Sequence, residues 1–153
     1  MTASALEHAR HILDAMLGYL GFAAQIEEDD GPDGPTLQVL TEDSDALIGR
    51  RGEVLEDIQY LVNRVLQRHL KDAPRIRVDV EFYRSMREDK MIARAKELGD
   101  RVRSTGLPAA LPPMNSYYRR LIHNVFVEDT EVMSVSASGE ARFKRITLKL
   151  REK

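Results

Sequence analysis

The sequence predicts an α+β protein, because segments with helical periodicity are interleaved with segments of alternating polarity. The clearest helix is expected to begin at Glu53, after which apolar residues recur at helical spacing as far as Leu66. The clearest strand is expected over residues 75–82, where apolar side chains at even-numbered positions alternate with charged ones at odd-numbered positions. With 153 residues, the chain is long enough for one ordinary domain or two small ones.

The first elements are expected to be a helix and a hairpin. Apolar residues recur at helical spacing over residues 5–20, and Gly21 follows as a C-terminal stop. Two short strands are expected at residues 22–27 and 36–41. They are joined by an acidic turn over residues 28–35 that is rich in Gly, Pro and Asp, which predicts a β-hairpin.

A short helix and a long helix follow the hairpin. Asp43 and Ser44 can cap a short helix through Ile48, and a glycine-rich turn at residues 49–52 precedes the long helix. The residues expected on the buried side of the long helix are Val54, Leu55, Ile58, Leu61, Val62, Val65 and Leu66. The predicted order is therefore helix, strand, strand, short helix, turn, long helix, strand.

The remaining residues predict a second module. The apolar stripe of its first helix is Met91, Ala95, Leu98 and Val102. A loop containing prolines, a helix over about residues 115–127, and strands at residues 132–137 and 145–151 follow. Because no linker rich in Pro, Gly or Ser separates residues 1–82 from residues 83–153, we expect the two modules to abut.

Composition narrows the class of protein. Apolar residues make up 42% and charged residues 31% of the chain, without low-complexity tracts, which is typical of a globular protein. The longest apolar run, residues 15–24, is too short for a membrane span of roughly twenty residues, and no basic start marks a secretory signal. The chain has no cysteine, which excludes disulfides and thiolate metal sites. We expect a cytoplasmic protein.

Charge is distributed unevenly along the chain. The formal net charge is −2, but residues 1–48 hold one Arg against ten acidic residues, whereas residues 49–153 hold 22 basic against 15 acidic residues. A basic segment favours polyanionic partners such as nucleic acids. Arg outnumbers Lys by 17 to 6, which suits bidentate contact with phosphate, although a GC-rich genome gives the same bias.

The positive segment begins at Gly49-Arg50-Arg51-Gly52, the first candidate site. The chain holds three Gly-x-x-Gly tetrapeptides, but only this one is flanked by positive charge and followed by a helix. Glycines allow close approach of a backbone, and a helix N-terminus offers N–H groups to phosphate. The segment lacks the Gly-Lys-Ser/Thr of a P-loop, so nucleotide hydrolysis is not implied. From the residues alone, a plain helical turn with solvated arginines stays open.

The element order and the segment Leu47-Ile48-Gly49-Arg50-Arg51-Gly52 together resemble the bacterial type II K-homology (KH) RNA-binding domain, whose signature loop joins two helices. The resemblance implies an α-β-β-α-α-β fold with a groove for about four nucleotides. The implied contacts are the backbone at Gly49 and Gly52, the charges of Arg50 and Arg51, and apolar surface for bases at Leu47 and Ile48.

The second candidate site lies in the helix expected after the proline-containing loop. Arg119 and His123 are four residues apart and share one helix face, a spacing that an exposed basic pair would also show. The surrounding residues 111–123 resemble the R-three-H domain, a small single-stranded nucleic-acid-binding domain named for its Arg-x-x-x-His motif, whose Arg and His face the ligand. Arg120 is expected to extend this surface. Tyr118 departs from the resemblance, because an acid is expected before the paired arginines.

A KH domain followed by an Arg-x-x-x-His domain is the arrangement of the Jag family, also called SpoIIIJ-associated or KhpB proteins. The chain resembles this family over nearly its whole length, including residues 79–84 and 138–140, but we do not expect it to contain the extra N-terminal Jag domain of many members. The family implies RNA chaperoning or post-transcriptional regulation linked to cell elongation and envelope synthesis. It also implies pairing with a small single-KH protein (KhpA) or with itself, and a gene beside that of the YidC/SpoIIIJ membrane insertase.

The sequence therefore predicts a non-catalytic protein without cofactor that binds single-stranded RNA, or single-stranded DNA, at two contact points. The second hypothesis is a nuclease with His123 as general base and Glu128 or Asp129 as the nearby acid, although no convergent carboxylate pair supports it. The third is a protein-interaction adaptor in which the KH helices form a dimer seam.

No metal site is expected either. His8 and His11, with Glu7, could hold a metal in principle, but no further ligand is spaced to help and that helix face is mostly apolar.

Overall fold

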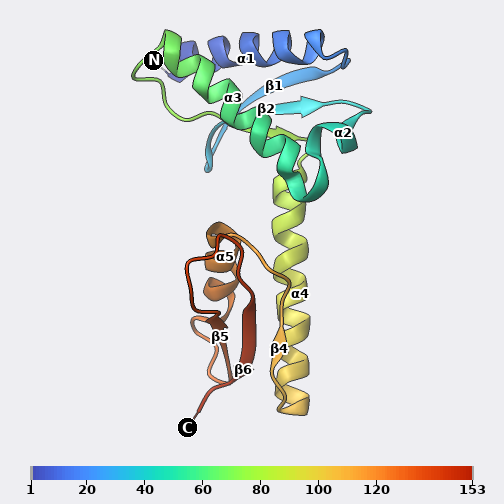
Figure 1. Ribbon diagram of the computed structural model, residues 1–153, viewed down its shortest axis with the longest axis vertical. Helices are drawn as coiled ribbons and strands as arrows, with labels where there is room; N and C mark the ends of the chain where they lie inside the picture. Colours follow the sequence, from blue (N-terminus) through green and yellow to red (C-terminus); the bar gives the residue numbers. More distant parts are fainter. Residues whose placement is uncertain (1, 153) are drawn as a thin grey trace. The chain divides into compact units, whose positions relative to one another are not determined.

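The computed structural model describes residues 2–152, and its helices and strands form the predicted α+β pattern (Figure 1). The chain divides into two compact units, Met1–Arg84 and Ser85–Lys153. Each unit has a three-stranded sheet and a hydrophobic core of its own.

The first unit follows the predicted order of elements. In chain order they are α1 (Thr2–Tyr19), β1 (Gln25–Gly31), β2 (Gly34–Leu40), α2 (Ser44–Ile48), the 3₁₀ turn η1 (Arg50–Gly52), α3 (Glu53–His69) and β3 (Arg77–Val80). β1 and β2 are antiparallel, and β3 pairs with β2 in parallel, so the sheet order is β1-β2-β3.

The core of the first unit lies between the sheet and the helices α1 and α3, which pack on each other and on the strands (Figure 1). Leu13 of α1, Leu37 of β2 and Val62 of α3 are fully buried in this core, and each such side chain contributes about 1.5–3 kcal/mol. Helix α1 ends as predicted, because Gly21 has φ +86° and the N–H of Phe22 donates to the carbonyl of Leu17 (2.9 Å).

The hairpin is tighter than predicted. Pairing continues to Gly31 and Gly34, so only Pro32 and Asp33 lie between the strands. The acidic residues 28–30 belong to β1, because their backbones pair with β2 while their side chains stay in solvent.

The last strand of the first unit is shorter than predicted. β3 ends at Val80, Glu81 and Phe82 have positive φ, and the Phe82 side chain is exposed rather than in the core. Asp79, predicted on the solvent face, is buried. Its carboxylate accepts hydrogen bonds from the backbone N–H groups of Val80 (2.9 Å) and Arg84 (3.2 Å), which fixes the turn into the next helix.

The second unit contains all but the first two residues of α4 (Tyr83–Thr105), followed by β4 (Ala109–Ala110), α5 (Ser116–Phe126), β5 (Val132–Ser136) and β6 (Ile146–Leu150). The strands form an antiparallel sheet of order β4-β6-β5, of which the short β4 was not predicted. The predicted stripe of α4 is in the core, with Ala95, Leu98 and Val102 buried and Met91 packed at its edge. At Gly99 an added Cβ would lie 2.8 Å from the Phe126 ring, so this glycine permits the close approach of α5 to α4.

Within residues 2–152, no helix combines the length and the apolar character needed to cross a membrane.

Candidate nucleic-acid interface

The turn between α2 and α3 has a backbone that requires its glycines. Gly49 has φ 73° and ψ −171°, a conformation essentially confined to glycine, and Gly52 is left-handed at φ 80°. The N–H of Gly49 donates to the carbonyl of Asp45 (2.9 Å), which ends α2. An added Cβ at Gly49 would lie 2.4 Å from Cγ2 of Val54, so the turn packs tightly against the first residues of α3.

The turn presents Arg50 and Arg51 to solvent at the N-terminal end of α3. Arg51 has φ 57°, a left-handed conformation that is uncommon for residues with a side chain. No side chain caps the N-terminus of α3 at Gly52, which leaves the positive end of the helix dipole facing the turn. Glu53 and Glu56 lie in the first turn of α3 and partly offset this positive potential.

The residues before the turn support it. Leu47 is only 2% exposed and belongs to the core, so in this conformation its side chain offers no surface to a base. Ile48 is partly buried and packs against the same core. Asp43 occupies the N-cap of α2 but its side chain makes no capping bond, contrary to prediction. Instead, the Thr41 hydroxyl accepts from the N–H of Asp43 (3.1 Å).

The second constellation lies on α5, which begins after Asn115. The Asn115 side chain accepts from the N–H of Tyr118 (3.1 Å) and caps the helix. One turn further on, Nη1 of Arg119 donates to the carbonyls of Met114 (2.7 Å) and Arg142 (3.3 Å). The guanidinium is thereby held between the start of α5 and the loop that leads into β6.

His123 lies one turn from Arg119 and contacts strand β5. Its Nδ1 is 2.5 Å from the hydroxyl of Ser134, and its Nε2 is 2.8 Å from the hydroxyl of Ser136. Burial of the ring, and secondly the positive charge of Arg119, lower the pKa of His123 below its ordinary value. Both ring nitrogens are therefore engaged by hydroxyls, and the neutral ring is favoured.

Sequence reasoning missed Ser134 and Ser136. The signal was present, because two serines at i and i+2 in a strand share one face. Nothing in the sequence indicated that this face would lie against His123, since strand and helix are separate segments.

The neighbouring α5 residues have distinct environments. Arg120 is exposed. Tyr118, the residue that departs from the expected acid, is buried in the core with the guanidinium of Arg87 4.5 Å from its ring centroid. Tyr117 is exposed and its hydroxyl donates to Glu88 (2.7 Å).

The carboxylate of Asp129, the acid considered for a nuclease, is held by contacts within the fold. One carboxylate oxygen accepts from the N–H groups of Glu131 (2.8 Å) and Val132 (2.9 Å), and the other pairs with Arg103. Desolvation raises the pKa of Asp129, but the two backbone hydrogen bonds and Arg103 outweigh it, so the pKa is lower than usual. This carboxylate closes the loop into β5 as an anion.

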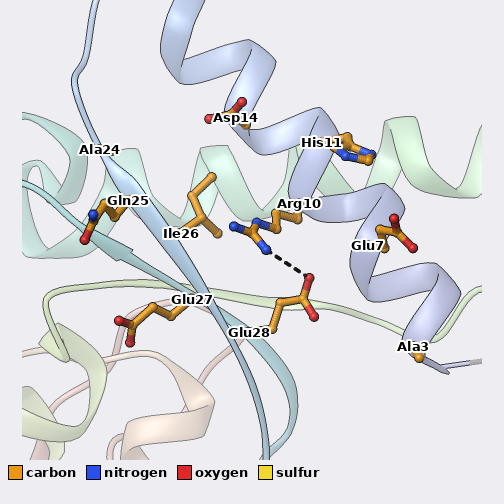
Figure 2. Close-up of a pocket in the computed structure, with 10 residues that line it drawn as sticks. All are labelled: Ala3, Glu7, Arg10, His11, Asp14, Ala24, Gln25, Ile26, Glu27 and Glu28. Atoms are coloured by element: carbon orange, nitrogen blue, oxygen red, sulfur yellow. Dashed lines mark ion pairs between the residues drawn. The ribbon is translucent and has the colours of Figure 1, made fainter.

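A shallow pocket of about 850 Å³ lies elsewhere, between α1 and β1 (Figure 2). All of its lining residues except Ala24 come from α1 and β1, four of the ten are acidic, and Arg10 pairs with Glu28 across it at 3.6 Å. His11 and Glu7 line it, whereas Nδ1 of His8 lies 2.7 Å from the carbonyl of Ser4. Across residues 2–152, no three His, Cys, Asp or Glu residues are grouped to hold a metal ion.

Comparison with known proteins identifies the second unit. Residues 89–150, which include Arg119 and His123, match the R-three-H domain family, so the chain is an R-three-H-domain protein. It is 31% identical to the RNA-binding protein KhpB of Clostridium symbiosum over 96% of this chain and 65% of that protein. It is also 29% identical to the KhpB of Lactiplantibacillus plantarum, over 80% of this chain and 38% of the relative.

A third relative, the RNA-binding protein KhpB of Bacillus subtilis, is 35% identical over 51% of this chain and 38% of that protein. The chain belongs to the KhpB family. It spans less than two thirds of the length of these relatives.

Proposed function

We propose that this chain binds single-stranded RNA without catalysing a reaction. The observation that carries the proposal is the R-three-H match over residues 89–150, because it encloses the Arg119–His123 constellation. The relatives named RNA-binding protein KhpB support the choice of RNA as ligand.

Arg119 is suited to hold a phosphate. The hydrogen bonds to Met114 and Arg142 use only Nη1, so among residues 2–152 the Nε and Nη2 donors of Arg119 have no protein acceptor. Two serine hydroxyls fix the His123 ring, and its lowered pKa favours the neutral form, so we assign it to positioning and to contact through its ring rather than to charge. Both ring nitrogens of His123 lie against serine hydroxyls, and the Asp129 carboxylate is held by two backbone N–H groups and Arg103, which argues against the nuclease hypothesis.

We further propose that the first unit is a type II KH domain that grips RNA at Gly49–Gly52. Its support is the α-β-β-α-α-β order and the exposed arginines beside an uncapped helix N-terminus. In this assignment the backbone of the turn and the arginines contact the phosphates of about four nucleotides. Ile48 is the apolar candidate for base contact, and Leu47 supports the turn from the core.

Titration of labelled single-stranded RNA, single-stranded DNA and duplexes tests the proposal. Wild type is expected to prefer single strands and to lose affinity as salt is raised. The variants Arg50→Asp/Arg51→Asp and Arg119→Ala/His123→Ala are each expected to weaken binding about tenfold or more. A folded wild type that binds no nucleic acid at moderate salt contradicts the proposal.

Matched controls separate local contacts from general charge. Arg64→Asp/Arg68→Asp makes the same charge change on exposed positions of α3 away from the turn, and is expected to lose much less affinity. Because Arg119 and His123 also hold the second unit together, thermal unfolding of each variant must show a folded protein. Metal-dependent cleavage abolished by His123→Ala would instead favour the enzyme.

An adaptor function is the second candidate, favoured by two apolar side chains exposed on α3. Tyr60 is 65% and Leu61 is 47% exposed, a combination that would suit a dimer seam with a second copy or with KhpA. Sedimentation of wild type and Leu61→Glu, alone and with KhpA, tests this. The RNA-chaperone role, the link to cell elongation and the cytoplasmic location stay predictions.

A further inference from the structure

We propose that the ring of Phe143 is a stacking platform for a base of the bound single strand. The inference rests on the proposed RNA binding of the second unit. Phe143 lies in the loop between β5 and β6, and its side chain is 51% exposed although it is aromatic. Stacking on exposed aromatic rings is the usual way in which proteins hold unpaired bases, since every base has a π-face.

The backbone around Phe143 is held on both sides. The next residue, Lys144, exchanges two backbone hydrogen bonds with Met114 (3.0 and 3.1 Å), and the N–H of Ala137 donates to the carbonyl of Arg145 (3.0 Å). The carbonyl of the preceding residue, Arg142, accepts a hydrogen bond from Nη1 of Arg119 (3.3 Å). The ring is therefore presented from an ordered backbone, so that little conformational entropy is lost when a base stacks on it.

The charge around the ring fits a nucleotide. The loop over residues 137–145 carries three basic side chains and one acidic one, Glu140. The guanidinium carbon of Arg142 lies 5.5 Å from the Phe143 ring centroid. This cation lies over the ring, where it brings a phosphate partner to the stacking surface.

The position of the ring also follows from Arg119. Because the Arg119 guanidinium bonds to the carbonyl of the residue before Phe143, the proposed phosphate contact and the ring are coupled through one peptide unit. The residue that would hold a phosphate thus contacts the loop that carries the ring. Stacking on this ring gives the second unit a contact that is independent of charge.

The absence of tryptophan from the chain makes a direct test possible. Phe143→Trp introduces a single indole, whose fluorescence is expected to be quenched when a single-stranded uridine oligonucleotide binds, with affinity kept or increased. Phe143→Ala and Phe143→Leu are expected to weaken binding about fivefold or more, because neither supplies a flat ring. Tyr19→Trp is the matched control, since Tyr19 is exposed and outside both sites, and its fluorescence should not change.

An oligonucleotide with abasic sugars identifies the origin of the loss. Phe143→Ala is expected to bind this strand as well as wild type does, because no base is present to stack. Equal losses on the abasic and the normal strand would overturn stacking. The same measurement on single-stranded DNA is expected to show the same loss, since stacking does not involve the 2′-hydroxyl.

The outcomes separate this inference from the proposed function. If wild type binds RNA and Arg119→Ala weakens binding, but Phe143→Ala binds as wild type and the indole is silent, the role of Phe143 is wrong and the proposed function stands. If wild type binds no single strand, the proposed function fails and the inference fails with it. Unfolding curves of the Phe143 variants should match wild type, since the side chain is half exposed.

Discussion

At the scale of single residues, Gly49 is fixed by packing inside the protein. Its φ and ψ are essentially confined to glycine, and a Cβ would also clash with Val54. We predict that Gly49→Ala lowers the free energy of unfolding by about 2 kcal/mol or more, measured by urea denaturation. A Gly49→Ala/Val54→Ala double variant should recover only part of this loss, because the backbone N of Val54 lies 3.0 Å from the added Cβ. Unchanged stability in Gly49→Ala would show that the turn relaxes freely.

His123 gives the fold a pH dependence whose sign is fixed. Its pKa is lowered in the folded protein, so the unfolded chain takes up a proton first as the pH falls below the ordinary value of 6.5. The contribution of this ring to stability is therefore complete above pH 6.5 and is lost as the pH falls toward the lowered pKa. We predict that wild type loses stability over this range and that His123→Asn loses less. An NMR titration that places the ring pKa at or above 6.5 would contradict this.

At the scale of elements, α3 completes the edge of the sheet. The Asn63 side chain donates to the carbonyl of Ile76 (2.7 Å) and accepts from the N–H of Ile76 (2.8 Å), and Gln59 accepts from the N–H of Val78 (3.0 Å). These amides take the place of a further strand beside β3, whose other edge pairs with β2. Polar residues are therefore buried on a helix face where the periodic pattern would place apolar ones.

We predict that Asn63→Ala lowers the free energy of unfolding by about 2–4 kcal/mol, because it leaves the buried N–H and carbonyl of Ile76 without partners. Gln67→Ala, one turn along α3 and exposed, is the matched control and should change stability by less than about 0.5 kcal/mol. Chemical denaturation of both variants measures the difference. Equal effects of the two substitutions would show that water replaces the Asn63 contacts.

The same helix shows what a sequence can and cannot predict. Periodicity correctly identified Leu55, Ile58, Val62 and Leu66 as buried, because that pattern is local. It misplaced Val54 and Leu61, which are partly exposed, and missed Gln59 and Asn63. The partners of Gln59 and Asn63 are backbone groups of β3 and of the residue before it, more than ten residues away in the sequence. No local pattern encodes such a contact.

The candidate sites also combine features that the sequence could predict with features that it could not. The positions of Arg119 and His123 one turn apart follow from helix geometry and were predictable. The hydroxyls of Ser134 and Ser136, and the carbonyl of Arg142 that anchors Arg119, come from a strand and a loop that tertiary folding brings to α5. The burial of Leu47 was likewise invisible, because a short helix has too few turns to show its inner face.

At the scale of the whole molecule, each compact unit carries its own basic constellation, at the start of α3 in one and on α5 in the other. If both contact one RNA, binding at the first raises the effective concentration at the second. We predict that wild-type affinity rises steeply once the RNA is long enough to reach both, by about a hundredfold over the better single site. The measurement is a titration with single-stranded RNAs of graded length.

The single-site variants are the decisive comparison. Arg50→Asp/Arg51→Asp and Arg119→Ala should each bind long RNA only slightly better than short RNA, since a longer strand then offers only more overlapping registers. The salt dependence of long-RNA binding should fall with each variant, because fewer counterions are released. If both variants keep the wild-type length profile, the units bind RNA independently, and the affinity of the protein is that of its stronger unit.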